Sequence, residues 1–377
     1  MKGEDRDSEK IMPNDFKSGD DALRKEAARI IRERQNSDLD GLVGGLQAVI
    51  INTEPDLQKA VVEELLRYSG LEFHGAYQDE HYRTCVLKVQ ASPQFRSTDF
   101  LIRSRQSGEN PFLDINEAPK SRNLPNTRLE TFVFEVKNLE KYVSIQTKKG
   151  TKFITNDILN FDNYDFIQTV PSRWTGNSLG FIQWKTHRGE YASFRDDTIP
   201  WVPKKPHHPH LNNIKWLDHA ATRVRAQDRD AAILEFMSHT NYNFDFAIYV
   251  SSLNSITSVA RLSSSDFAMV FTSGISPDLE GSASGPTEKF IRNYGSRVHH
   301  IAFQTEHIEE TYRALQNDGM KFLIELVGSP EEGLKQTFTE PSEKTMLVTE
   351  YIHRYGDFQG FFTRSNVTLL TAATDRQ

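Results

Sequence analysis

Two histidines and one glutamate, on three separate predicted strands, are the residues of this chain with the clearest chemical potential. His219 lies in the stretch WLDHAATRV, His300 in RVHHIAFQT and Glu350 in MLVTEYI. Two neutral imidazoles and one carboxylate are the ligands that hold Fe(II) on one face in many non-haem enzymes and leave the opposite positions open. The three residues therefore predict a ferrous site, provided that the fold brings their strands together.

Strand alternation distinguishes the two adjacent histidines of RVHHIAFQT. Successive side chains of a strand point to opposite faces of the sheet. His300 is therefore expected to share the inner, concave face with Val298, whereas His299 shares the outer face with Ile301 and Phe303. The outer face is expected to pack on the helix predicted directly after this strand. Only His300 is then a candidate ligand.

The strands that carry these residues belong to a pattern that occurs twice in the chain. RVHHIAFQTEHIEETYRALQNDGMKFLI aligns without a gap with RLETFVFEVKNLEKYVSIQTKKGTKFIT, which places His300 opposite Thr131. In the same way WLDHAATRV places His219 opposite Ala48, and MLVTEYI placed opposite LGFIQWK sets Glu350 against Gln183. Fixed-period similarity is typical of duplicated architectures. The chain is therefore predicted to have two like halves of two β-α-β-type modules each, with the ligand set in one half only.

Four segments follow from this pattern. Residues 1–40 form a polar, charge-rich N-terminal extension with a helix in ALRKEAARIIRERQ, and residues 41–197 form the first barrel domain, which binds no metal. A proline-rich linker, TIPWVPKKPHHPHLNNIK, spans residues 198–215, and residues 216–377 form the second, metal-binding barrel domain. The histidines of PHHPH have no carboxylate nearby and are expected to be solvated linker residues.

The amino-acid composition of the chain narrows the classes of function that the protein can have. The chain has 377 residues and is 37% hydrophobic, which suits two globular domains. Its net charge of -7 gives no reason to expect nucleic acid or an anionic membrane as a partner. The single cysteine, Cys85, excludes an internal disulfide and a cysteine-based zinc site. Without an apolar signal segment or a long apolar run, the sequence predicts a cytoplasmic protein.

With these motifs in place, the second half resembles the family of 4-hydroxyphenylpyruvate dioxygenase and hydroxymandelate synthase, in the vicinal oxygen chelate superfamily. The matching stretches, in the family's order over residues 214–368, are LDHAATRV, SSLNSI, VHHIAFQTEHI, QTFTEP, TEYIHR and QGFFTRSN. The first half resembles that family's non-metal-binding half in architecture only. The resemblance implies an α+β fold in which each half is an open barrel of paired βαβββ modules.

The resemblance also implies a reaction. A small 2-oxo acid chelates Fe(II) through its carboxylate and keto oxygens, and dioxygen takes the remaining site. Oxidative decarboxylation of the oxo acid is followed by hydroxylation of the rest of the same molecule, so no separate 2-oxoglutarate is required. Substrate and O2 are the expected partners, Fe(II) is the expected cofactor, and a homo-oligomeric state stays open.

Six substrate-site residues follow from the same resemblance. Ser255 and Gln336 stand where the family has polar substrate-binding groups, and Ser273 is nearest to the asparagine of the family's P-I-N-E-P stretch, which reads FTSGIS here. The family's pocket aromatics and its C-terminal asparagine are matched by Phe338, Phe361 and Asn366.

Several family positions differ in this chain. The family's S-Q-I-Q stretch reads GPTEKF, so its glutamine is missing, and GFFTRSN replaces the glycine-rich GFGxGN. Val367 replaces an aromatic residue that stacks on the substrate ring. The iron site and oxo-acid chemistry are therefore expected to be kept, whereas the residues that would recognise a 4-hydroxyphenyl ring are not all present, so the identity of the 2-oxo acid stays open.

Two other classes of protein remain open. An extradiol ring-cleaving dioxygenase of the same superfamily uses the same three ligands, but the QTF and QGF stretches favour the oxo-acid branch. A non-catalytic binding module that kept the fold is the other alternative. The intact ligand set argues against that module, because unused ligands are the first residues that such a protein is expected to lose.

Overall fold

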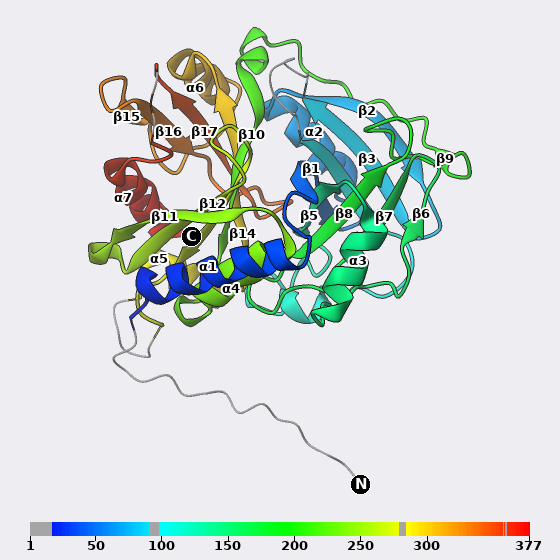
Figure 1. Ribbon diagram of the computed structural model, residues 1–377. Coiled ribbons are helices and arrows are strands. Elements are labelled where there is room, and N and C mark those ends of the chain that lie inside the picture. Colours follow the sequence, from blue (N-terminus) through cyan, green and yellow to red (C-terminus); the bar gives the residue numbers. More distant parts are fainter. Residues whose placement is uncertain (1–16, 90–97, 279–283, 357, 359) are drawn as a thin grey trace.

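The computed structural model describes residues 17–89, 98–278, 284–356, 358 and 360–377. Two curved sheets stand side by side, the first built from the N-terminal half of the chain and the second from the C-terminal half (Figure 1). No helix within the described ranges is long and apolar enough to cross a membrane.

The first sheet has the strand order β6-β7-β8-β5-β1-β4-β3-β2-β9. Its strands are β1 (Val43–Thr53), β2 (Leu71–Gln78), β3 (Tyr82–Val89), β4 (Asp99–Arg105), β5 (Arg128–Val136), β6 (Leu159–Asn160), β7 (Tyr164–Gln168), β8 (Ser178–Trp184) and β9 (Asp197–Thr198).

The second sheet has the strand order β11-β12-β13-β10-β14-β17-β16-β15. Its strands are β10 (Ile214–Arg223), β11 (Asn243–Val250), β12 (Ser255–Arg261), β13 (Ala268–Ser273), β14 (Arg297–Thr305), β15 (Val327–Ser329), β16 (Leu334–Phe338) and β17 (Val348–Arg354).

Apart from β9, which extends the first sheet, the two sheets have the same topology. In each, a central antiparallel pair (β1 with β5, β10 with β14) is flanked by parallel partners (β4 and β8, β13 and β17). Each half therefore contains two modules that meet at the central pair. This arrangement confirms the expected α+β fold of two open barrels.

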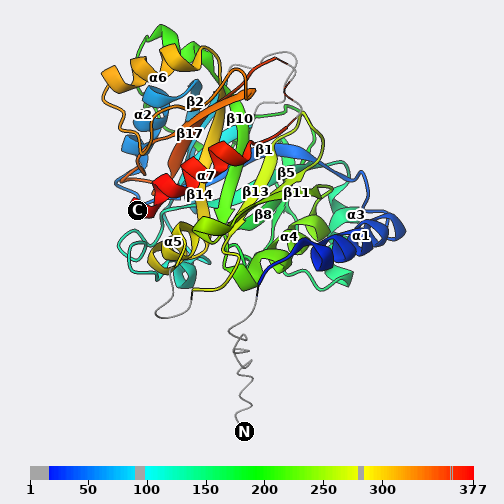
Figure 2. The same cartoon turned by 90° about the vertical axis from the view of Figure 1, so that its left-hand side faces the viewer.

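The helices lie around the sheets and across one barrel opening. They are α1 (Asp20–Asn36), α2 (Gln58–Tyr68), α3 (Leu139–Lys148), α4 (Arg229–His239), α5 (Pro286–Tyr294), α6 (Ile308–Asn317) and α7 (Arg364–Ala373), with short 3-10 turns at Leu113–Asn116, Pro209–Asn213, Ala226–Asp228, Ser251–Leu253 and Thr374–Arg376. Figure 2 shows α7 in front of β10 and β14. Because α7 packs against β11 at one sheet edge and β15 and β16 at the other, it closes the open side of the second barrel.

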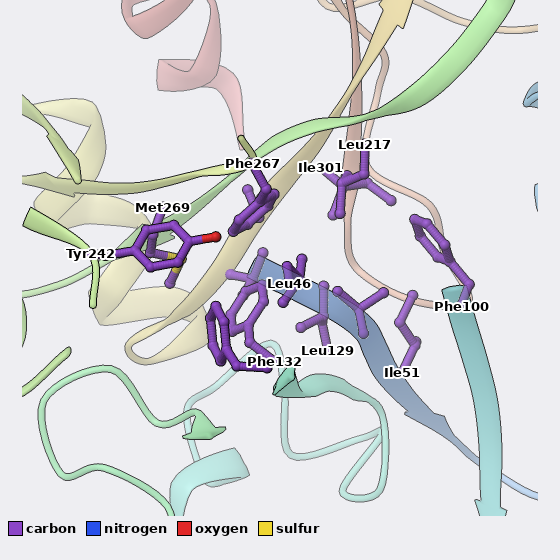
Figure 3. Close-up of a cluster of buried hydrophobic side chains, with 14 of the residues drawn as sticks. Leu46, Ile51, Phe100, Leu129, Phe132, Leu217, Tyr242, Phe267, Met269 and Ile301 are labelled. Atoms are coloured by element: carbon purple, nitrogen blue, oxygen red, sulfur yellow. The ribbon is translucent and has the colours of Figure 1, made fainter. Parts of the chain in front are cut away.

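The main hydrophobic core lies between the two sheets. Figure 3 shows side chains of both halves pointing toward one another. Phe100 stacks on Phe303 with ring centroids 5.8 Å apart, and Phe132 packs against Phe267 at 6.1 Å. The opposite face of each sheet encloses its own smaller clusters. The sheets therefore pack back to back, and each concave face is left to line a barrel interior.

A helix forms in the N-terminal extension, as expected, and one side of it is buried. Helix α1 packs along α4 of the second half (Figure 1). Arg34 is buried and donates hydrogen bonds to the carbonyl oxygens of Met237, Thr240 and Tyr242 at 3.3, 3.0 and 2.8 Å. The charge of Arg34 therefore serves an internal contact rather than a solvated face.

The expected alternation along RVHHIAFQT is wrong at one residue. Across the ladder, Ala221 pairs with His300 but Thr222 pairs with Val298, so His299 is an extra residue in a β-bulge. Beyond a bulge, the side chains of the strand point to the opposite face of the sheet from the one that simple alternation predicts. Val298 accordingly joins the outer core with Ile301, whereas His299 and His300 both face the barrel interior.

The expected counterpart of Glu350 is also wrong. Ala302 pairs with Glu350 in the second sheet, and Val133, its counterpart, pairs with Gly180 in the first. The residue that corresponds to Glu350 is thus Gly180, not Gln183. Apolar residues alternate with other residues in both strands. Alignment of the two sequences alone therefore allowed a shifted pairing, which the hydrogen-bonded register excludes.

Candidate metal centre

His219, His300 and Glu350 meet inside the second barrel, each from a different strand. One ligand atom from each lies within 4.8 Å of the others, and all three residues are buried. Nε2 of His219 lies 3.0 Å from Oε2 of Glu350, and Nε2 of His300 lies 3.3 Å from the same oxygen. Two imidazole nitrogens and a carboxylate oxygen that converge in this way form a donor set suited to Fe(II). The residues present therefore fit a ferrous ion.

The three strands converge because they are neighbours in the sheet. β14 lies between β10 and β17, so the three ligands stand on adjacent strands of one concave face. His219 pairs across the ladder with Ala302, which itself pairs with Glu350. The small alanine between them leaves room for the two ligands to approach one another above it.

A chain of hydrogen bonds links Glu350 to helix α7. Gln336 on β16 donates from Nε2 to Oε1 of Glu350 at 2.5 Å, and Asn366 on α7 donates from Nδ2 to Oε1 of Gln336 at 3.0 Å. All three side chains are buried. The carboxylate is therefore held in one orientation, with Oε2 toward the histidines and Oε1 toward the glutamine.

His219 is oriented by a carboxylate of its own strand. A bulge at Asp218 brings Oδ1 of that residue to 2.7 Å from Nδ1 of His219. Arg354 at the end of β17 forms an ion pair with Asp218. A carboxylate on the second nitrogen of a ligating histidine fixes the tautomer and the ring orientation. Nε2 of His219 is thereby left for the metal.

His299 contacts His300 in the barrel interior and does not join the outer core. Its Nδ1 lies 2.8 Å from Nδ1 of His300, and its Nε2 lies 2.8 Å from Oε1 of Gln377 near the C-terminus. Phe338 packs on the ring of His300, with centroids 4.7 Å apart. The ring of His300 is thus fixed from two sides, and its Nε2 faces Glu350.

The pKa values of His219 and His300 are shifted in opposite directions. Burial opposes the charge of His219, but Glu350 and Asp218 outweigh it and raise the pKa of this residue to about 9. Burial, together with the neighbouring His299 and His219, holds the pKa of His300 well below its ordinary value. His300 is therefore neutral and ready to bind, whereas a metal must displace a proton from His219.

The centre borders a small cavity beneath α7. The volume open to the centres of water molecules is about 40 Å³. This is far below the roughly 300–1,000 Å³ of pockets for drug-sized ligands. The lining residues are Arg223, Thr257, Val270, Thr272, Thr287, His299, His300, Gln336, Phe338, Glu350, Phe362, Val367, Leu370, Thr371 and Thr374.

Two of the six expected substrate residues line this cavity, Gln336 and Phe338. Asn366 lies one hydrogen bond away, behind Gln336. Phe361 packs on the ring of His219 at 5.5 Å and lines a separate cleft that contains Arg354 and Asp218.

The two expected serines do not line the cavity. Ser255 is buried at the start of β12, and Ser273 donates to the carbonyl oxygen of Gly274. Thr257 and Thr272, on the same two strands, line the cavity instead.

Sequence reasoning missed several cavity residues. Arg223 follows His219 by four positions on one strand and therefore shares its face, a signal that alternation alone provides. Phe362, next to the expected Phe361, packs on His219 at 5.2 Å. The threonines of α5 and α7 gave no such signal, because only the folded chain brings these helices to the cavity.

The first barrel lacks a corresponding centre. Ala48, Thr131 and Gly180 stand at the three ligand positions. The ring of Phe166 lies 2.9 Å from where a side-chain carbon at Gly180 would be, so an aromatic ring fills this space. Gln168 donates to Thr131 at 2.8 Å where the second half has Phe338 against His300. Within the described ranges, the His219, His300 and Glu350 group is the one set of such residues close enough to share an ion.

Comparisons with known proteins agree on the fold. No protein-family model and no curated protein sequence matches the chain. Among solved structures, a triple mutant of 4-hydroxymandelate synthase from Streptomyces coelicolor is similar at a TM-score of 0.62 and 13% identity, covering 89% of this chain and 98% of that one.

A second similar structure is a xylose isomerase-like TIM barrel/4-hydroxyphenylpyruvate dioxygenase fusion protein, with a TM-score of 0.62 and 14% identity. The match covers 94% of this chain and 58% of the fusion protein, so this chain corresponds to part of that protein's length. The chain thus has the fold found in 4-hydroxymandelate synthase and in this dioxygenase fusion, as its motifs led us to expect.

Proposed function

We propose that this protein is a non-haem Fe(II) dioxygenase that oxidatively decarboxylates a 2-oxo acid and hydroxylates the same molecule. The observation that carries the proposal is the buried convergence of His219, His300 and Glu350. The fold shared with 4-hydroxymandelate synthase and the dioxygenase fusion supports it. We assign the reaction to the second domain, 216–377, and a scaffold role to residues 41–197, with 198–215 as the linker.

The protein's part in this reaction is positioning. His219, His300 and Glu350 would hold the ferrous ion, which when bound supplies the redox chemistry that activates O2. Asp218 and Gln336 keep two of these ligands in one orientation. Phe338 and Phe362 present apolar surface beside the ligands, which excludes water from the reacting groups.

The reaction balances without another reductant. The bond between the carboxylate carbon and the keto carbon of the 2-oxo acid breaks, and CO2 leaves. One oxygen atom of O2 enters the new carboxylate, and the other replaces a hydrogen as a hydroxyl group on the remaining chain. All four electrons come from the substrate. The product is a hydroxy acid that is one carbon shorter.

Simultaneous measurement of O2 uptake and CO2 release tests this proposal. Iron-loaded protein is offered a panel of 2-oxo acids and, separately, catechols. The proposal predicts equal amounts of O2 consumed and CO2 released with at least one oxo acid. O2 uptake with catechols and no CO2 would indicate the extradiol alternative. A protein that retains iron but consumes no O2 on either panel, or that retains no iron, would contradict the proposal.

A further inference from the structure

Arg223 is a buried cation in the wall of the metal cavity. It lies on β10, on the same face as His219, with 4% of its surface exposed. Its guanidinium donates to the carbonyl oxygen of Pro286 at 3.2 Å and to Oγ1 of Thr374 at 2.7 Å, and it lies over the ring of Phe290 at 4.7 Å. Both hydrogen-bond acceptors are neutral.

No acidic side chain among the described residues pairs with Arg223. Other arginines in this chain have such partners: Arg354 pairs with Asp218, and Arg229 pairs with Asp20. Burial without a counter-charge lowers the pKa of Arg223 to about 9. An unpaired buried charge costs several kcal/mol in a folded protein. An anion bound beside Arg223 would offset that cost.

A few other buried arginines also lack a carboxylate, and they show what a purely structural role requires. Arg34, Arg128 and Arg297 all donate to main-chain carbonyl oxygens at contacts between segments. None of them lines the metal cavity. Arg223 differs because it lines the same cavity as His300 and Glu350.

The rest of the cavity wall combines hydroxyl groups with apolar side chains. Five threonines line it, and Oγ1 of Thr272 is buried without a hydrogen-bond partner. Hydroxyl groups donate to carboxylate oxygens.

We infer that the substrate is a short 2-oxo acid with a second carboxylate at its far end, which Arg223 and the cavity threonines bind. The inference rests on the proposed function, since the first carboxylate and the keto oxygen are placed on the metal. Arg223 then sets specificity, because the pocket is left with an unpaired charge when the far end is neutral. The product is a hydroxylated dicarboxylate.

Binding of two matched ligands tests this assignment without turnover. The protein is loaded with Zn(II), and calorimetry measures the affinity for 2-oxoglutarate and for 5-methyl-2-oxohexanoate, in which an isopropyl group replaces the far carboxylate. A hydrogen-bonded charge contributes about 1.5–3 kcal/mol, which corresponds to about 10–150-fold in affinity. The wild-type protein is expected to prefer the dicarboxylate by this factor, and 2-oxoadipate tests a longer chain.

Variants separate recognition from a structural role. Arg223→Gln is expected to abolish the preference while keeping the affinity for 5-methyl-2-oxohexanoate, and Arg223→Lys is expected to keep part of the preference. Arg34→Gln removes a buried arginine outside the cavity. It is expected to lower the free energy of unfolding and to leave the preference unchanged, so loss of stability alone cannot imitate the effect of Arg223→Gln.

The outcomes distinguish this inference from the proposed function. A wild-type protein that binds 5-methyl-2-oxohexanoate as tightly as either dicarboxylate refutes the inference but leaves the 2-oxo-acid function standing. The same holds if Arg223→Gln retains the full preference. A protein that retains neither metal nor any 2-oxo acid refutes both. If Arg223→Gln does not fold, the comparison of the ligands on the wild-type protein still tests whether the pocket prefers a dicarboxylate.

Discussion

Arg128 and Arg297 form reciprocal contacts across the junction of the two halves. Arg297 donates to the carbonyl oxygen of Thr127 at 2.7 Å, and Arg128 donates to the carbonyl oxygen of Ser296. The two arginines occupy equivalent positions at the starts of β14 and β5. Each half thus binds the residue that precedes the other half's arginine, and the pair links the two halves.

Substituting methionine for either arginine is expected to lower the free energy of unfolding by about 1–3 kcal/mol, because a buried carbonyl oxygen loses its donor. Burial and the nearby charge of Arg297 hold the pKa of Arg128 well below its usual range. Each single variant therefore relieves the repulsion between the two charges, and the double variant can relieve it only once, so the double variant should lose more stability than the sum of the two single variants. Urea denaturation of the four proteins measures this coupling. Strict additivity would show that the two guanidiniums act independently.

His300→Ala is expected to abolish Fe(II) binding, because it removes one of the three ligands. His299→Ala removes only the group at 2.8 Å from Nδ1 of His300 and should weaken binding by about 10–100-fold, as is usual for residues that orient a ligand. Thr131→Ala, at the equivalent position of the first half, is the control and should leave binding unchanged. Anaerobic titration with a competing chelator measures the affinities. Equal losses at 299 and 300 would refute the ligand assignment.

Asp218→Asn is expected to weaken Fe(II) binding by about 10–100-fold, since the ring of His219 loses its carboxylate partner. Gln47 occupies the matching bulge of the first half, next to Ala48, and Gln47→Ala is the matched control. The same chelator competition gives the affinities of both variants. If Asp218→Asn binds iron as the wild type does, Asp218 acts only through its ion pair with Arg354.

Glu288 at the start of α5 predicts a dependence of stability on pH. Burial raises the pKa of this residue to about 7, against the backbone hydrogen bonds that it accepts from Gly274 and Ala226. Because the folded-state pKa is raised, its contribution to stability is present below pH 4.5 and is lost as the pH rises through about 7. Glu288→Gln is therefore expected to be more stable than the wild type at pH 8, by at most about 3 kcal/mol.

Thermal unfolding at pH 5 and pH 8 measures this effect, with Glu343→Gln, an exposed glutamate, as the control. The difference between wild type and Glu288→Gln should shrink as the pH falls. A difference that is constant from pH 5 to pH 8 would show that Glu288 is ionised throughout this range.

The sequence was sufficient for the fold and for picking out three residues that the structure brings together, His219, His300 and Glu350. His219 and His300 stand out because Ala48 and Thr131 replace them in the other half. Strand alternation failed at His299, because a bulge depends on the pairing of two strands and leaves no mark in the spacing of one.

The residues that line the cavity were harder to predict from the sequence, for a similar reason. Thr287 and Thr374 reach the cavity from segments whose position is set by tertiary packing. Ser273 was assigned from a motif that is altered here, and its neighbour Thr272 faces the cavity in its place. Arg223 could have been found, because it follows His219 by an even number of strand positions.

The iron content of the protein tests the central claim most directly. The chain is loaded anaerobically with Fe(II), separated from free metal and analysed by mass spectrometry, alongside Glu350→Ala. The account predicts one iron per chain for the wild type and none above background for the variant, since Glu350 supplies the carboxylate of the centre. Wild-type protein without iron, or Glu350→Ala with a full complement of it, would contradict the account.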